Sequence, residues 1–282
     1  SSVGSAFSQI CWKNALVVLC FAFIGLFSIL PHLGVVGMAF GRSWYRTILP
    51  SNPGLQHFQA ALGHSLTIPS ISNSMRYAVL ALLLALALGT FAAYVIVRGK
   101  GKWRWLLDCC TMLPLAVPGL VLAFGYLAMS QKGHLFHFLD PVQNPTILLV
   151  IAYAVRRLPY IVRAAVAGLQ QTSVSFEEAA ASLGATPLTA FRRITMPLIA
   201  ANLIAGSILT FSFAMLEVSD SLILAHKAAF FPITKAIYEL SSLLGQGQAL
   251  ASALGLWTML FLGISMLTAS SLLGKRMGAI FR

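Results

Sequence analysis

The chain has 282 residues, of which 58% are hydrophobic and only 9% charged, and its mean hydropathy is +0.84. Soluble domains carry about 25% charged residues, so a chain with so few cannot cover a water-facing surface of this size. Lipid must therefore be the solvent for much of it. The formal net charge of +12 does not indicate a nucleic-acid partner, because the basic residues lie in short breaks between apolar runs instead of forming one stripe.

Six apolar runs each approach the roughly 20 residues that a helix needs to cross a bilayer, and they predict an all-α polytopic membrane protein with six transmembrane helices. The fourth run is the weakest, because Arg156 and Arg157 interrupt it. Charge at that depth is costly unless it faces a bundle interior or an aqueous cavity. The predicted spans are about residues 14–39, 74–97, 105–129, 145–169, 198–224 and 248–273.

The basic residues between the runs predict the orientation of the chain. With a cytoplasmic N-terminus, thirteen of the nineteen basic residues fall on the inner side, and the cluster at 98–104 contributes four of them. Both termini are therefore predicted to be cytoplasmic. The thirteen inner cations are Lys13, Arg98, Lys100, Lys102, Arg104, Arg156, Arg157, Arg163, Arg192, Arg193, Lys275, Arg276 and Arg282.

The longest predicted inner segment, about residues 170–197, has its own helical pattern. Ser175 and Glu178 form a capping box, which predicts that a short helix begins at Ser175. Gly184 suits the end of that helix, where a left-handed residue is needed. Thr186-Pro187 then fits the cap and the first residue of a second helix.

Two interpretations of this hairpin are open on physical grounds: a surface connection between two spans, or a docking element for a cytoplasmic partner. Small side chains on one face allow close approach, and an ordered loop of this length needs something to pack against, which favours docking. The predicted apolar face consists of Phe176, Ala179, Ala180 and Leu183.

The same segment contains Glu178-Ala179-Ala180, followed by Gly184, Ile194 and Pro197 at fixed spacing. This pattern resembles the EAA loop of binding-protein-dependent ABC importer permeases, with Met196 in place of the usual leucine as its one departure. The resemblance extends over about residues 70–282. Segments similar to permeases of the iron(III), polyamine and phosphonate type are Asn73-Ser74, Leu113-Pro114, Pro118-Gly119 and Arg157-Leu158-Pro159-Tyr160.

The resemblance implies that two permease halves, from the same or a homologous chain, form one pathway in the bacterial cytoplasmic (inner) membrane. Two cytoplasmic ATPase subunits would dock on a coupling helix between the fourth and fifth spans. A periplasmic or lipid-anchored substrate-binding protein would deliver the cargo, which stays open among iron(III), polyamine, phosphonate and sugar. Residues 1–282 would form a single transmembrane domain, or the C-terminal half of a longer fused permease.

No enzymatic activity and no bound cofactor are expected of the chain itself. It contains no GxxxxGK[ST] loop to cradle phosphates, so ATP and magnesium would bind to the partner ATPase. His134 and His137 lack a third ligand, and we expect no metal site there.

Glu217 and Asp220 are the acids of the fifth predicted span, three residues apart and so on one helical face. About 30 Å of helix would separate Pro197 from Glu217, which places the pair near the outer end. They are candidates for the substrate pathway or an outer gate, or else a structural pair bonded to neighbouring helix ends. The segment 217–222 is similar to the Glu-Leu-Pro-x-Thr-Leu segment of iron permeases, with Val218 and Ser219 departing from it.

Two further readings of the whole chain are open. One is half of a secondary transporter driven by an ion gradient, a class that places unwound helices and coupling residues near the midplane. The other is a membrane-embedded enzyme, for which the sequence contains no recognisable catalytic set. Pro114 and Pro118 predict a kink in the third span, either static or a bending point.

Overall fold

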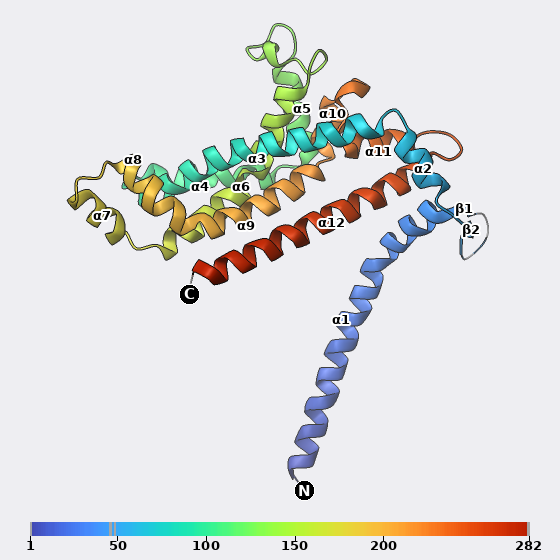
Figure 1. The fold of residues 1–282 in the computed structure, drawn as a ribbon, viewed down its shortest axis with the longest axis horizontal. Coiled ribbons are helices and arrows are strands. Elements are labelled where there is room, and N and C mark those ends of the chain that lie inside the picture. The colour runs from blue at the N-terminus through green and yellow to red at the C-terminus, as the bar shows by residue number, and fades with distance from the viewer. Residues whose placement is uncertain (1, 45–46, 48, 281–282) are drawn as a thin grey trace. The chain divides into compact units, whose positions relative to one another are not determined.

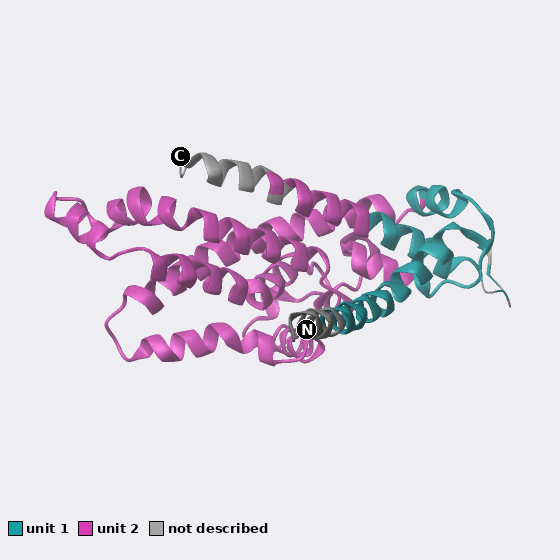
Figure 2. Cartoon of the chain, turned by 90° about the horizontal axis from the view of Figure 1, so that it is seen from below, with its two compact units in different colours: residues 1–63, 240–258 teal, residues 64–239, 259–282 magenta. Residues whose placement is uncertain are grey.

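The computed structural model describes residues 2–44, 47 and 49–280. Of the basic residues that predict the orientation, Arg46 and Arg282 lie outside the described residues, as do the side chains of Lys13, Lys275 and Arg276. The chain forms two compact units: residues 1–63 with 240–258, and residues 64–239 with 259–282 (Figure 2).

The first unit begins with the long helix α1 (Ser2–Phe40). From Asn14 onward its side chains are largely apolar and exposed, as expected of a helix surrounded by lipid. Two short strands follow, β1 (Gly41–Ser43) and β2 (Ser51–Pro53), paired antiparallel. The all-α prediction did not include them. Helix α2 (Gln56–Gly63) then packs on the strands through the buried His57, whose Nε2 lies 3.1 Å from the Gly41 carbonyl oxygen.

The second unit is a bundle of helices (Figure 1). Its elements are α3 (Thr67–Arg98), α4 (Trp103–Ala116), α5 (Gly119–Met129), η1 (His137–Leu139), α6 (Thr146–Gln171), α7 (Ser175–Ser182), α8 (Pro187–Ala190), the π-helix η2 (Phe191–Thr195), α9 (Met196–Met215), α10 (Ser219–Leu224), η3 (Ala228–Phe230), most of α11 (Ile233–Ser241) and the later part of α12 (Gly247–Ile280).

Helix α6 lies at the centre of this unit and packs against both α3 and α9. Small residues bring the backbones close. A Cβ on Gly89 of α3 would lie 2.8 Å from Ile161 Cγ2, and a Cβ on Gly206 of α9 would lie 2.7 Å from Ala164 Cβ. Helices in lipid associate mainly through such van der Waals contact, so glycines at the crossing points are what allow the three helices to pack.

Four helical segments of the described chain are long and apolar enough to cross a membrane: Asn14–Phe40, Thr67–Arg98, Pro187–Met215 and Gly247–Thr268. They correspond to the first, second, fifth and sixth predicted spans. Helices α4 and α5 qualify only as a pair, which makes the number four or five. Helix α6 contains Arg156, Arg157 and Arg163 and does not qualify by composition, in line with the weakness of the fourth predicted span.

The third and fifth predicted spans are not single continuous helices. The bend in the third span confirms the kink predicted from its prolines, whereas the break in the fifth span was not predicted. Helices α4 and α5 meet at an angle of 105°. Pro118 disfavours the helical conformation of the residue before it, and Val117 is extended, with φ −98° and ψ 131°. The fifth span ends at Met215, and α10 begins only at Ser219.

Replacing Gly206 by alanine should lower the stability of the protein. The added methyl would press on Ala164 Cβ, which its own helix holds in place, and overpacking of this kind costs about 1–3 kcal/mol. Gly125→Ala is the matched control, because nothing lies within 4 Å of a Cβ at that position in α5. Thermal unfolding of the purified protein in detergent measures both variants. Equal midpoints would contradict the close approach of α6 and α9.

Candidate functional site

Helix α7 begins at Ser175 as predicted, but the predicted capping box does not form. Val174 already has helical angles, φ −61° and ψ −27°, and no side chain caps the helix at that position. Ser175 Oγ instead lies 2.6 Å from Ser173 Oγ, which also accepts the Ser175 backbone N–H at 3.3 Å. Ser175 is therefore the first helical residue and not the cap. Ser173 Oγ accepts the backbone N–H of this first helical residue.

The predicted end of α7 and start of α8 are confirmed. Gly184 is left-handed, with φ +84°. Its N–H donates to the Ala181 carbonyl at 2.9 Å, and the Ala185 N–H donates to the Ala180 carbonyl at 3.0 Å. These are the two hydrogen bonds of a Schellman motif. Thr186 caps α8 by accepting the Thr189 N–H at 3.3 Å, with Pro187 at the first helical position.

Most of the apolar surface of this loop is exposed. Leu183 is 89% exposed, and Phe176 and Leu188 are more than half exposed. Of the predicted apolar face, only Ala180 is buried. Apolar side chains gathered on an ordered surface are typical of an interaction site. In Figure 1, α7 and α8 lie beyond the ends of α4, α6 and α9.

The loop is tied to the bundle by Glu177, which the sequence analysis did not single out. Its carboxylate accepts hydrogen bonds from Arg98 Nε at 3.3 Å, the Tyr94 hydroxyl at 3.2 Å and the Thr195 hydroxyl at 3.0 Å. The neighbouring Glu178, the acid of the EAA pattern, is exposed. The sequence holds one signal for Glu177: two acids are adjacent, and a capping box gives a role only to Glu178. The other acid therefore needs a different partner.

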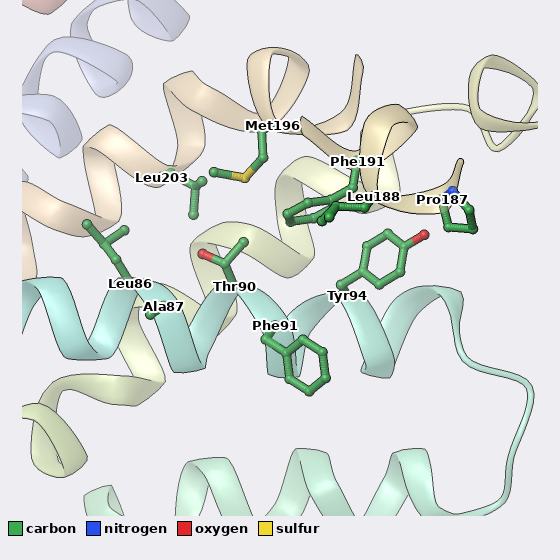
Figure 3. A pocket seen from close by; sticks show the side chains of 10 residues that line it. All are labelled: Leu86, Ala87, Thr90, Phe91, Tyr94, Pro187, Leu188, Phe191, Met196 and Leu203. Atoms are coloured by element: carbon green, nitrogen blue, oxygen red, sulfur yellow. The ribbon is translucent and has the colours of Figure 1, made fainter. Parts of the chain in front are cut away.

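A pocket of about 650 Å³ lies between α3 and the segment from α8 to α9 (Figure 3). Tyr94 lies at this pocket, and its ring meets Phe191 edge-on, with centroids 5.2 Å apart. The lining is almost wholly apolar, so it offers nothing to orient a charged cargo. The lining residues are Leu86, Ala87, Thr90, Phe91, Tyr94, Pro187, Leu188, Phe191, Met196 and Leu203.

The two predicted acids of the fifth span meet Arg156 and Arg157 of α6. These arginines lie within the helix and are paired there, which corrects their assignment to the inner segments between spans. Arg156 Nε lies 3.2 Å from Asp220 Oδ2 and 3.5 Å from Glu217 Oε2, and Arg157 Nη2 is hydrogen-bonded to Glu217 Oε2. Both acids are buried, Glu217 at 4% exposure and Asp220 at 0%. We call these four side chains the charge cluster. Sequence spacing could not reveal it, because neither acid has a cation one helical turn away.

The charge cluster lies where the helices are broken. Glu217 also accepts the Ser219 N–H through Oε1 at 3.1 Å, and its backbone carbonyl accepts the Thr234 hydroxyl at 2.6 Å. A Cβ on Gly119, at the start of α5, would lie 2.6 Å from Arg156 Nη2. The carboxylate of Glu217 thus accepts the first backbone N–H of α10. The beginnings of α5, α10 and α11 all lie around the charge cluster.

Comparison with known proteins identifies the family. Residues 85–278 match the family described as the binding-protein-dependent transport system inner membrane component. The chain belongs to this family. The resemblance found in the sequence is thereby confirmed, and the chain is a multi-pass component of an inner membrane.

Relatives of this permease carry several cargo names. The chain is 33% identical over 151 residues to the ferric transport system permease protein FbpB of Actinobacillus pleuropneumoniae, covering 54% of this chain and 21% of that protein. It is 33% identical over 150 residues to the molybdenum transport system permease protein ModB of Escherichia coli K12, covering 51% and 66%. The match thus spans about a fifth of the ferric relative and about two thirds of the molybdenum one.

The fold of this permease matches that of solved transporters. A crystal structure of a bacterial ABC transporter involved in the import of the acidic polysaccharide alginate superposes with a TM-score of 0.78 at 17% identity, covering 98% of this chain and 99% of that one. An inward-facing structure of the MetNI methionine ABC transporter gives a TM-score of 0.60 at 11% identity, covering 74% and 95%. At these identities the likeness shows the fold alone.

His134 and His137 are both exposed, before and within η1. Among the described residues, no group of three His, Cys, Asp or Glu side chains is arranged to hold a metal ion.

Replacing Glu217 by glutamine should destabilise this permease strongly, because it leaves buried arginine charge uncompensated. Breaking one side of a buried pair costs about 3–5 kcal/mol. The double variant Glu217→Gln/Arg157→Gln should regain part of that loss. Glu239→Gln is the control: its pair with Lys235, at 2.8 Å, is partly exposed, and such pairs contribute about 1 kcal/mol or less.

Thermal unfolding in detergent measures these variants, and substrate uptake per folded complex separates structure from transport. A Glu217→Gln protein as stable as the Glu239→Gln control would contradict a compensating role for the charge cluster. Unchanged uptake per folded complex, together with a loss of stability, would make the cluster structural only.

Proposed function

We propose that this chain is the transmembrane permease subunit of an ATP-driven importer, forming half of the substrate pathway and coupling to a cytoplasmic ATPase through the loop at 170–197. Two ATPase subunits, which bind ATP and magnesium, carry out hydrolysis, and this chain binds no cofactor. A second permease half, from the same or a homologous chain, completes the pathway, and a periplasmic or lipid-anchored protein delivers the substrate.

The observation that carries this proposal is the exposed apolar surface of α7 on a loop that is anchored at its base. Phe176 and Leu183 project from a helix only eight residues long, whose ends are fixed by the Ser173 contacts and by Gly184. A segment this ordered, with its apolar side chains facing outward, supports docking more than a simple connection between spans. The EAA residues Glu178, Ala179, Ala180, Gly184, Ile194 and Pro197 form the proposed coupling loop.

Family membership favours the ATP-driven importer over the secondary transporter, because members of this family work with a binding protein. The relatives named for ferric iron and molybdenum suggest a small inorganic ion as the cargo of this chain too. Stimulation of ATP hydrolysis by binding protein loaded with each candidate ion would identify it. The chain serves as one transmembrane domain, alone or as the C-terminal half of a fused permease.

Glu217 and Asp220 are proposed to act at an outer gate of this pathway. They are paired with α6 at the point where α10 and α5 begin, so separation of the charge cluster would free both helix starts to move. The buried atoms Asp220 Oδ1 and Arg156 Nη2 have no hydrogen-bond partner within the described part of the chain, so the cluster has spare capacity for a second arrangement.

The orientation of the chain is tested by reporters. A reporter fused after Lys102 or after Gly184 should be cytoplasmic, and one inserted near Gln56 should be external, because the cations at 98–104 hold their loop on the inner side. Protease accessibility or enzymatic reporters measure this in whole cells. An external location for 98–104 would reverse the orientation and remove the cytoplasmic docking site.

Replacing Gly184 by valine should abolish association with the ATPase and uptake, with the permease still in the membrane. Apart from the two neighbouring residues, no atom of the described residues lies within 4 Å of a Cβ at Gly184. The cost therefore comes from its φ of +84°, which a valine resists by about 1–2 kcal/mol or more. The turn after α7 would reorganise. Co-purification and uptake measure the effect.

Gly133→Val is the matched control for this test. Gly133 has φ +91° and equally open surroundings, but it lies in the loop between α5 and α6. Its variant should suffer similar backbone strain and retain association with the ATPase. Normal uptake by the Gly184→Val protein would contradict the coupling role of α7.

A further inference from the structure

We propose that Glu177 is the positioning residue of the coupling loop, which makes α7 and the inner end of α3 move as one body. This inference rests on the proposed function, because it concerns how a force applied to α7 reaches the membrane helices. It assigns different tasks to two adjacent acids: Glu178 faces outward, and Glu177 faces the bundle.

The carboxylate of Glu177 uses both of its oxygens to join two elements to α7. Oε1 accepts from Arg98 Nε of α3 and from the Thr195 hydroxyl of η2, and Oε2 accepts from the Tyr94 hydroxyl of α3. Hydrogen bonds to an ionised carboxylate are roughly twice as strong as neutral ones. Tyr94 and Arg98 are one helical turn apart, so both of their side chains emerge from the same face of α3.

The site is largely shielded from water. The side chain of Glu177 is 15% exposed, that of Arg98 is 11% exposed, and Thr195 is fully buried. An ion pair in such a place is screened less than one on the surface, and its geometry is more restricted. The π-helix η2 begins at Phe191 and ends at Thr195. The Phe191 ring contacts the ring of Tyr94, beside the Glu177 carboxylate.

Arg98 extends the connection to α6. Its Nη2 donates to the carbonyl oxygen of Thr172 at 2.8 Å, and Thr172 is the residue that directly follows the end of α6. One guanidinium therefore joins the end of α3, the end of α6 and the start of α7. Lysine could not replace it, because a single ammonium lacks the planar fork that reaches two acceptors in fixed directions.

The need for such an anchor follows from the exposure of α7. A docking helix that presents Phe176 and Leu183 to a partner cannot also use them to pack on its own chain. Only Ala180 is buried among the residues of α7, and a single methyl group contributes little area. Polar contacts must therefore set the position of α7, and Glu177 provides three of them.

The test uses the complete permease–ATPase complex in proteoliposomes with loaded binding protein. Glu177→Gln keeps the volume of the side chain but removes its charge, and Arg98→Lys keeps the charge but removes the fork. Both variants should still assemble with the ATPase and hydrolyse ATP, because the exposed face of α7 is unchanged. Uptake per ATP hydrolysed should fall by about tenfold, within the usual range of coupling free energies.

The exchanged pair Glu177→Arg/Arg98→Glu should recover part of the coupling, and Glu239→Gln is the control for loss of an acid elsewhere. If the wild-type complex couples uptake to ATP hydrolysis and Glu177→Gln shows the same uptake per ATP, this inference is overturned and the proposed function is not. Loss of assembly in a folded Glu177→Gln protein would make Glu177 a docking contact and would overturn it as well. A wild-type permease that binds no ATPase would instead overturn the proposed function.

Discussion

The scarcity of acids is the constraint on which this structure depends. The chain has seven acidic residues against nineteen basic ones, and five of the seven are in ion pairs. Charge in a lipid-solvated chain is tolerated where it is paired and faces the protein interior. Four of the paired acids join segments more than fifty residues apart: Asp108, Glu177, Glu217 and Asp220. Each pair therefore fixes a tertiary contact as well as balancing a charge.

The charge cluster also explains how broken helices can exist in this fold. A chain at membrane depth must satisfy its backbone groups internally, and irregular backbone is tolerated only where it is buried in protein or lines water. At the break after α9, the Glu217 side chain accepts the Ser219 N–H and its carbonyl accepts the Thr234 hydroxyl. At the break before α5, Gly119 lets the chain approach Arg156 closely. The charge cluster thus adjoins both irregular segments.

Local sequence patterns predicted the features that depend on neighbouring residues. The ion pairs between distant segments could not be predicted in this way. Apolar runs located α3 and α12, and Gly184 and Thr186 marked the turn after α7, because helix length and left-handed geometry depend on neighbouring residues. The capping box at Ser175 was wrong, because Val174 occupies the cap position and Ser175 bonds to Ser173 instead. The arginines that pair with Glu177 and Glu217 lie 60 or more residues away in sequence, where no periodicity can indicate them.

Helix α6 connects the two polar sites of the second unit. At its end, the Thr172 carbonyl binds Arg98, and through Arg98 it is joined to Glu177 and α7. About 21 Å along the helix, at 1.5 Å per residue from Gln171 back to Arg157, it carries the arginines of the charge cluster. Gly89 and Gly206 hold α3 and α9 in close contact with it, and tightly packed helices transmit displacement instead of absorbing it. A shift of α7 would therefore reach the Glu217 and Asp220 pairs through α6, which joins the proposed coupling loop to the proposed gate.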